Sequence, residues 1–295
     1  MTTVGIEFGG TLVTAVAVDE RGQVMARATE SSAGDPAAAA RAVIRDVRSN
    51  GADGRAAGVT IPFHDDELSS AVSAVVAEET GAVPVAVKAG HALALGEAWC
   101  GAASGCQDVV AFAIGEHVTA GILISGRLLT GANGYAGSVA WLALNPVERE
   151  DYRRYGGLEA EVAAAGLVRR LVWRVKSGDH SQVVDGLRGE LTRLTAEDVL
   201  SAARAGDGVC ISVVRDTAKY VGMAVANLAT VIDPECVVLG GTLASSGDLM
   251  ADAIRAECSR RLRPAQSERI RVVLSTLGAD AGAIGAARAA RLERR

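Results

Sequence analysis

Residues 4–18 read VGIEFGGTLVTAVAV, and this stretch decides the expected fold. Apolar residues alternate with glycine or glutamate in its first half, and an apolar run covers 13–18, so two β-strands are predicted. Gly9 and Gly10 fall between the strands, where the backbone must turn sharply or come close to a ligand. The stretch is therefore either a simple hairpin or a phosphate-binding hairpin, in which Thr11 adds a hydroxyl and a backbone N–H.

The composition indicates a soluble protein with room for two domains. The chain has 295 residues, of which 49% are hydrophobic, and its net charge of -5 arises from acids and bases mixed along the chain. Because there is no basic tract, we expect no nucleic-acid partner. No apolar run reaches the ~18 residues of a membrane span. The first predicted strand begins within the first few residues, with no signal peptide before it, so we expect a cytoplasmic protein. The five scattered cysteines indicate reduced thiols.

Strands alternate with helices along the rest of the chain, which indicates an α/β fold. Asp35 before Pro is a helix N-cap, and Thr195 begins a capping box. A long apolar helix is predicted over 208–232 and another helix over 158–174, whereas 145–154 is a polar excursion.

The strand–turn–strand beginning of the chain is repeated at 109–129. Such a repeat is expected when a chain contains two related domains. We therefore predict an N-terminal domain over 1–108, completed by a C-terminal helix over 279–295, and a larger domain over 109–278.

Several segments carry the pattern of one family. They are ISGRLLTGANGYAG at 124–137, ARAGD at 203–207, YVG to NL at 220–228, IDPE and VVLGG at 232–241, and LGADAGAIGAA at 277–287. With the Gly-Gly-Thr hairpin, nearly the whole chain resembles the ROK family (repressors, open reading frames and sugar kinases) of bacterial glucokinase type. The resemblance implies two actin-like (ribonuclease H-like) α/β domains of the ASKHA sugar-kinase type facing each other across a cleft, and a homodimer.

The general base implied by the resemblance is missing. A sugar kinase moves the γ-phosphoryl of ATP to a hydroxyl whose proton a carboxylate accepts. In the family this carboxylate is the Asp of an Asn-Asp pair after a Val-rich strand, here PVAV at 84–87. Counting back from Glu97 puts Lys88 and Ala89 at the pair, and counting forward from the strand gives Ala89 and Gly90. Neither count supplies a carboxylate.

The nucleotide site implied by the resemblance is also altered. Its phosphate- and nucleotide-binding positions are Glu7, Gly9, Gly10, Thr11, Gly115, Gly240 and Gly241. Glu7 replaces an Asp and is one methylene longer. After Gly115, the family's Gly-Thr-Gly turn is replaced by Glu116 and His117, which add negative charge and bulk beside phosphate. The glycines also suit a role in folding alone, so MgATP stays an open possibility as cofactor.

The sugar site implied by the resemblance comprises Glu159, Gly137, Ser138 and His91. Ser138 replaces the family's sugar-binding Glu, which leaves Glu159 as the remaining acid; its alternative role is an acid favoured at a helix N-terminus. His91 alternatively is a satisfied or solvent-facing histidine. Trp141, where the family has a His that also serves zinc, stacks on a ligand, plugs the site or packs in the core.

No metal site is predicted. The family's zinc site is a Cys-x-Cys-Gly-x-x-Gly-Cys run before Leu-Glu, and here EDYRRYGG at 150–157 precedes Leu158-Glu159. Without thiols we expect no structural zinc, so this polar segment must be held in another way or stay mobile.

An intact scaffold with altered chemistry predicts a ROK-family sugar-kinase homologue that is a sugar- or partner-binding pseudokinase. The alternative is an ATP-dependent, glucokinase-like kinase for a sugar or sugar-like hydroxyl, with Glu7 or the Asp65-Asp66 loop as base. A repressor is disfavoured, because the family's repressors carry a helix-turn-helix domain before the hairpin. A silent subunit of a mixed dimer is a further alternative.

Overall fold

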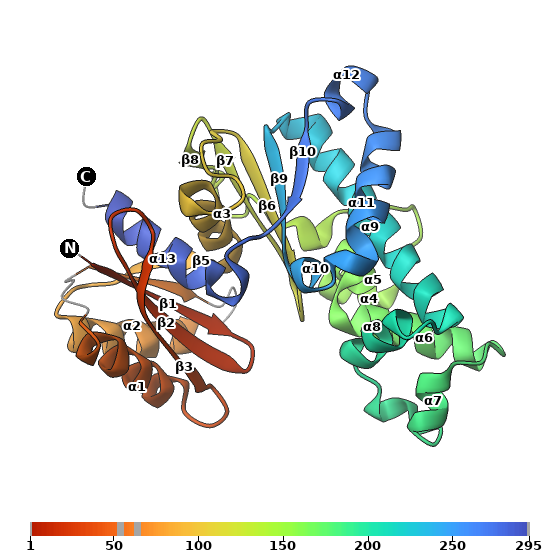
Figure 1. The fold of residues 1–295 in the computed structure, drawn as a ribbon, viewed down its shortest axis with the longest axis horizontal. Helices are drawn as coiled ribbons and strands as arrows, with labels where there is room; N and C mark the ends of the chain where they lie inside the picture. Colours follow the sequence, from red (N-terminus) through yellow and green to blue (C-terminus); the bar gives the residue numbers. More distant parts are fainter. Residues whose placement is uncertain (1, 52–55, 62–65, 294–295) are drawn as a thin grey trace. The chain divides into compact units, whose positions relative to one another are not determined.

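A computed structural model describes residues 2–51, 56–61 and 66–293 (Figure 1). The strands are β1 (Thr3–Gly9), β2 (Leu12–Val18), β3 (Val24–Ser31), β4 (Ala57–Ile61), β5 (Val85–Lys88), β6 (Val109–Ile114), β7 (Val118–Ile124), β8 (Arg127–Leu128), β9 (Cys236–Gly241) and β10 (Arg271–Leu274). The α-helices are α1 (Pro36–Ser49), α2 (Asp66–Thr80), α3 (Ala89–Cys100), α4 (Glu150–Tyr155), α5 (Gly157–Val162), α6 (Ala164–Lys176), α7 (Gln182–Gly186), α8 (Ala196–Arg204), α9 (Gly208–Ile232), α10 (Thr242–Ser245), α11 (Gly247–Arg261), α12 (Pro264–Ser267) and α13 (Ala281–Leu292). Three 3-10 turns are η1 (Val139–Trp141), η2 (Leu191–Arg193) and η3 (Gly278–Asp280). Strands and helices alternate, so the predicted α/β class is confirmed.

The strands of the described residues form two five-stranded sheets with the same strand order. One sheet is β3-β2-β1-β4-β5 and the other, read from its far edge, is β8-β7-β6-β9-β10. In the first sheet β2 pairs antiparallel with β1 and β3, whereas β4 pairs parallel with β1 and β5. In the second, β7 and β8 are antiparallel and β9 and β10 are parallel. The repeat predicted from the sequence is therefore present.

The chain divides into two compact units. The first consists of Met1–Phe112, Ala120–Gly137 and Ser275–Arg295, and the second of Ala113–Thr119 and Ser138–Leu274. The first unit thus includes α13 from the end of the chain and the glycine-rich loop that follows β8.

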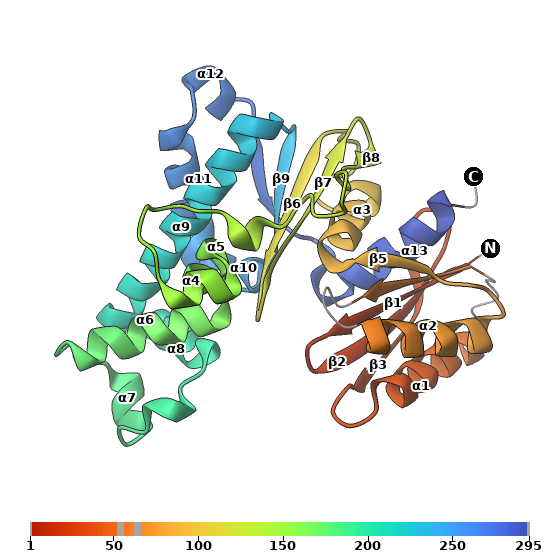
Figure 2. The ribbon, with the colours of Figure 1, turned by 180° about the vertical axis from the view of Figure 1, so that it is seen from behind.

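In the first unit, helices cover both faces of the sheet. Helices α1 and α2 pack on one face, and α13 with α3 on the other (Figures 1 and 2). Helix α13 packs so closely against its neighbours that backbone atoms contact backbone atoms. A Cβ on Gly5 would lie 1.8 Å from the carbonyl oxygen of Ala283, and a Cβ on Gly285 would lie 1.7 Å from that of Ala92. Gly285 of the LGADAGAIGAA pattern therefore has a packing role.

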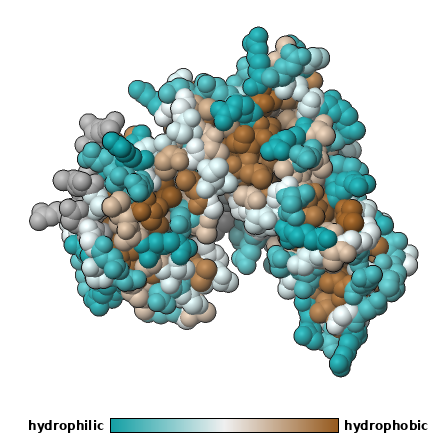
Figure 3. Space-filling model, viewed as in Figure 1, coloured by the Kyte–Doolittle hydropathy of each residue, from teal (hydrophilic) through white to brown (hydrophobic). Residues whose placement is uncertain are grey.

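In the second unit, the long helix predicted over 208–232 is confirmed as α9, and it packs against α11. Strand β9 is buried except for its last residue, Gly241, whereas Val272, Val273 and Leu274 of the edge strand β10 are half-buried. The space-filling view accordingly has hydrophobic residues at the surface near β10 (Figure 3). The predicted caps at Asp35 and Thr195 are also present.

One prediction around residue 160 is wrong. The single helix expected over 158–174 is broken into α5 and α6 at Ala163, whose backbone is extended. The break arises because the N–H of Ala164 donates to the carbonyl oxygen of Gly115, at 3.0 Å, instead of continuing the helix. The expected polar excursion over 145–154 also contains a helix, α4.

In the part of the chain that the structure describes, no helix has the length and apolar character that crossing a bilayer requires.

Candidate functional site

The N-terminal hairpin forms as predicted. Gly9 pairs with Leu12 across β1 and β2, which leaves Gly10 and Thr11 as a two-residue turn. Ser32, just after β3, supports this turn: its hydroxyl donates to the carbonyl oxygen of Gly10 at 3.2 Å, and its N–H donates to that of Thr11 at 3.0 Å. The tip is exposed, so its backbone is accessible to a ligand; phosphate binding there stays a prediction.

The carboxylate of Glu7 is directed at the beginning of α13. It accepts backbone hydrogen bonds from Ala283 and Gly282, and a Cβ on Gly282 would lie 2.2 Å from its Oε1. Burial raises the pKa of Glu7 to about 7; the backbone hydrogen bonds oppose this rise and the charge of Asp280 adds to it. A helix N-terminus attracts negative charge, which accounts for the direction of the Glu7 carboxylate toward the beginning of α13.

No carboxylate stands at the beginning of α3. Lys88 is the N-cap and the half-buried Ala89 is the first helical residue. Gly90 fits closely against Ala120, whose carbonyl oxygen would lie 2.4 Å from an added Cβ. Both positions at which the family's base was sought therefore lack an acid. The alternative acids at 65–66 lie outside the described residues or have side chains that are not described.

Lys88 instead contacts the glycine-rich loop over 131–137. Its ammonium donates to the carbonyl oxygen of Gly134 and lies 5.6 Å from the ring centroid of Tyr135. Gly137, at φ 84°, ends the loop close to β7: an added Cβ would lie 2.5 Å from a carbonyl oxygen of that strand. The loop and the beginning of α3 are thus brought together in one unit.

His91 is buried beside this loop and is only 6% exposed, so the solvent-facing interpretation is wrong. Its ring is hydrogen-bonded to the backbone of Ala136, whereas Nε2 has no hydrogen-bond partner among the described residues. Burial lowers the pKa of His91, and the charge of Lys88 acts in the same direction. An unpaired buried nitrogen costs about 1–3 kcal/mol, so this atom requires an explanation such as a bound water or ligand.

In the second unit, the loop between β6 and β7 closes onto α5. The N–H of Gly115 donates to the carbonyl oxygen of His117 at 3.0 Å, which makes a tight turn. Glu159 Oε2 accepts from the N–H of Val118 at 2.9 Å, and its Oε1 lies 3.1 Å from Nδ1 of His117. The His117 side chain is 76% exposed and that of Glu159 13%. Glu159 lies in the first turn of α5, and the loop engages both of its oxygens.

The remaining predicted site residues of this unit lie at strand and turn ends. Gly240 is buried at the end of β9, and a Cβ on Gly241 would lie 2.3 Å from the carbonyl oxygen of Ile114, so this pair lies beside the loop after β6. Ser138 is half-buried before η1. Trp141 is 58% exposed, so its interpretation as a core residue is wrong.

The residues present do not fit zinc. Structural zinc sites in proteins use thiolates and imidazoles, and the segment over 145–157 contains neither. In the described ranges, no group of three or more His, Cys, Asp or Glu side chains is arranged to hold a metal ion. This segment is held by ion pairs that centre on Glu161, which sequence reasoning missed. The available signal was the Arg169-Arg170 pair one helix after two closely spaced glutamates.

Two sheets with one strand order, with glycine turns where their strands end, define the actin-like α/β fold of sugar kinases. The crystal structure of a ROK family glucokinase from Streptomyces griseus, in complex with glucose and AMPPNP, has this fold. It aligns with a TM-score of 0.81 at 26% identity, over 99% of this chain and 100% of that chain.

The ROK family model matches residues 72–293, and the chain belongs to this family. A glucokinase of Halalkalibacterium halodurans is 34% identical over 211 residues, which are 70% of this chain and 64% of that protein's length. A glucokinase of Thermotoga maritima is 27% identical over 304 residues, which cover 96% of this chain and 95% of that protein. The resemblance stated from the sequence is therefore confirmed.

Proposed function

We propose that this protein is a sugar- or partner-binding ROK-family member without efficient phosphotransfer. The observation that carries the proposal is Ala89 at the beginning of α3, where the family resemblance implies the general base. A methyl group cannot accept the proton of an attacking hydroxyl, and loss of a general base typically costs ~10²–10⁴-fold in rate.

The phosphate-binding parts support the same proposal. Glu7 is hydrogen-bonded to the backbone at the N-terminus of α13, so it must leave these donors before it can orient water around Mg²⁺. The exposed Glu116 places a negative charge in the loop that the resemblance assigns to phosphate. Like charges repel, which weakens binding of a polyphosphate there.

The ligand we propose is a neutral sugar or a similar polyol. Nε2 of His91 is buried without a partner among the described residues, and a hydroxyl group both donates and accepts hydrogen bonds. A sugar hydroxyl would therefore satisfy this nitrogen in either tautomer. In the second unit, Glu159 is a separate candidate acceptor for a ligand hydroxyl, since its Oε1 contacts only the exposed His117 ring at 3.1 Å among the described residues.

The second candidate function is an ATP-dependent sugar kinase. It is favoured by the relatives named glucokinases, one of which binds glucose and AMPPNP. A specific feature also favours it: with its pKa raised to about 7, Glu7 has the proton affinity that suits a general base at neutral pH.

We further propose a cytoplasmic homodimer that has no nucleic-acid partner. The mixed charge of the chain and its lack of a basic tract support the last point. Light scattering after size-exclusion chromatography tests the dimer, and a gel-shift assay with random-sequence DNA tests the absence of binding.

Calorimetric titration with glucose, MgATP and MgADP, together with a coupled assay for ADP release, separates the two candidate functions. The pseudokinase proposal expects heat with a hexose and no hexose-dependent ADP release. Hexose-dependent ADP release that disappears in Glu7→Gln would overturn it in favour of the kinase. Absence of heat with every hexose tested would exclude these sugars as ligands. A protein partner would then be the remaining form of the proposal.

A further inference from the structure

Helix α5 carries two carboxylates that point to different neighbours. Glu159 and Glu161 are two residues apart, which places their side chains about 200° apart around an α-helix. Glu159 binds the N–H of Val118 and contacts His117, as described above. Glu161, whose side chain is 9% exposed, instead faces α4 and α6. The helix is thus fixed from two sides.

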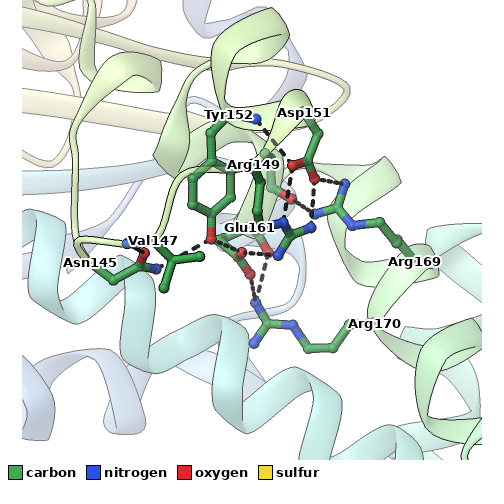
Figure 4. A network of polar contacts seen from close by, with 9 residues as sticks. Asn145, Val147, Arg149, Asp151, Tyr152, Glu161, Arg169 and Arg170 are labelled. Atoms are coloured by element: carbon green, nitrogen blue, oxygen red, sulfur yellow. Dashed lines mark hydrogen bonds and ion pairs between the residues drawn. The ribbon is translucent and has the colours of Figure 1, made fainter.

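Three side chains converge on Glu161 (Figure 4). Its Oε1 accepts from Nη1 of Arg149 at 3.0 Å and from the hydroxyl of Tyr152, and its Oε2 accepts from Nη2 of Arg170. Asn145 adds a fourth contact, because its Nδ2 donates to the Tyr152 hydroxyl at 3.2 Å. Glu161 therefore joins the segment before α4, α4 itself and α6.

A second set of contacts surrounds this centre. Asp151 pairs with Arg149, which donates to it through Nε at 3.1 Å, and with Arg169, whose Nη1 lies 2.9 Å away (Figure 4). The guanidinium of Arg170 also lies 5.0 Å from the ring centroid of Tyr220 in α9. Arg149 and Arg170 thus each have a second contact besides the one with Glu161.

Helix α5 is short, so its position depends on its contacts with the surrounding elements, to which the buried Leu158 and Val162 also contribute. It contains six residues and has no side-chain N-cap, and helices this short are marginal without tertiary contacts. The carbonyl groups at its C-terminal end are bound by α6: Arg169 donates to Ala160 and Arg170 to the carbonyl oxygen of Glu161. The arginines around Glu161 consequently contribute to the orientation of α5, and with it to the direction in which Glu159 points.

We propose that Glu161, together with Arg149, Tyr152 and Arg170, is a metal-free clasp that positions Glu159 against the loop between β6 and β7. Tyr152 lies in the stretch over 150–157 in which the family resemblance led us to seek zinc ligands, and Arg149 directly precedes that stretch. The donor set of the clasp does not fit zinc. Glu161 is a positioning residue, since it acts through α5 and not on a ligand. The inference is independent of whether the chain phosphorylates a sugar.

Hydrogen exchange of two backbone amides in the full-length protein tests the clasp. The Val118 amide donates to Glu159, whereas the Ala164 amide donates to the carbonyl oxygen of Gly115 and serves as the reference. In Glu161→Gln, protection of Val118 relative to Ala164 should fall about tenfold, as it should in Glu159→Gln, because a hydrogen bond to a charged group is lost or misaligned. Glu150→Gln, an exposed acid of α4, is the matched control.

The milder Tyr152→Phe, which removes a single hydroxyl, replaces Glu161→Gln if that variant does not fold; it should lower the same ratio about threefold. Addition of a chelator should leave the ratio of the unmodified protein unchanged. A ratio in Glu161→Gln or Tyr152→Phe equal to that of the unmodified protein would overturn the proposal. A fall of the ratio on chelation would do so too, since a metal would then hold the segment.

Discussion

Glu7 and Gly282 lie in direct contact: a Cβ on Gly282 would be 2.2 Å from Oε1 of Glu7. The first strand of the chain and its last helix therefore meet through a carboxylate and a residue without a side chain. This contact gives Glu7 its two backbone donors, while burial raises its pKa against their effect. It also ties the predicted phosphate hairpin to the end of the chain.

Substitutions of glycine by alanine should rank by the atom that the new methyl meets. In Gly285→Ala the methyl meets the backbone carbonyl of Ala92 at 1.7 Å, so more than about 3 kcal/mol of unfolding free energy should be lost. In Gly282→Ala it meets the movable end of Glu7, and the loss should be about 1 kcal/mol. Gly208→Ala, an exposed helical position with nothing within 4 Å, should be neutral or stabilise by about 0.5 kcal/mol. Urea denaturation of the three variants measures the order, and a loss in Gly282→Ala as large as that in Gly285→Ala would contradict it.

The titration of Glu7 should make the protein less stable as the pH rises. Its pKa is about 7 in the folded state and 4.5 without the fold, so the folded state holds more protons between these values. The stabilisation is complete below about pH 4.5 and is lost as the pH rises through about 7, with at most about 3 kcal/mol involved.

Melting temperatures at pH 5 and pH 8 measure this effect as a difference between variants. The gap between Glu7→Gln and the unmodified protein should grow in favour of the variant by up to about 10 °C between the two pH values. Glu20→Gln, at an exposed turn, is the control and should show no such growth. A gap independent of pH would mean that Glu7 ionises in the folded protein as it does in the unfolded one.

Introducing a carboxylate at residue 89 should raise phosphotransfer if the missing base limits the rate. Ala89 is half-buried at the first position of α3, where a helix N-terminus accommodates an acid. Ala89→Asp should release ADP in the presence of glucose about 10²-fold faster than the unmodified protein, and Ala89→Asn, of the same shape, should not. Equal rates in the two variants would show that Glu116 and His117 also prevent the reaction.

The sequence was informative where local patterns decide the structure and less so where distant contacts do. The hairpin, the capping residues and helix α9 follow from alternation, caps and a continuous apolar pattern, and all are present. The break at Ala163 was missed because it results from the bond between Ala164 and Gly115, which are far apart in the sequence. The predicted alternatives for Glu7 also omitted its contact with α13, since no local pattern pairs the first strand with the last helix.

The lack of an acid at residues 89 and 90 follows from the sequence directly, because it is a matter of residue type at those positions. The clasp around Glu161 does not, because charged residues are common on helix surfaces and only the fold shows which of them converge. The burial of single side chains could not be predicted from the sequence either. Trp141 is exposed and His91 is buried, which is the reverse of what an apolar ring and a polar ring suggest.

His91 provides the sharpest test of the sugar site. A core histidine contributes to stability, whereas one kept for a ligand leaves a buried polar atom unpaired until the ligand binds. Replacing it by the apolar His91→Leu removes the orphaned Nε2 along with the bond to Ala136. The melting temperature should therefore stay within about 3 °C of the unmodified protein, while affinity for a bound hexose should fall about tenfold or more.

Low pH should also distinguish the His91→Leu variant from the unmodified protein. Because burial holds the pKa of His91 below its usual 6.5, its neutral form is favoured in the folded state, and stability present above that pH should be lost as the pH falls through the lower folded value. His91→Leu removes this loss, so the variant should melt higher than the unmodified protein at pH 5 although the two are matched at pH 8. If the variant instead melts about 10 °C lower at both pH values and binds the hexose unchanged, His91 is a structural residue and the sugar site must be sought around Glu159.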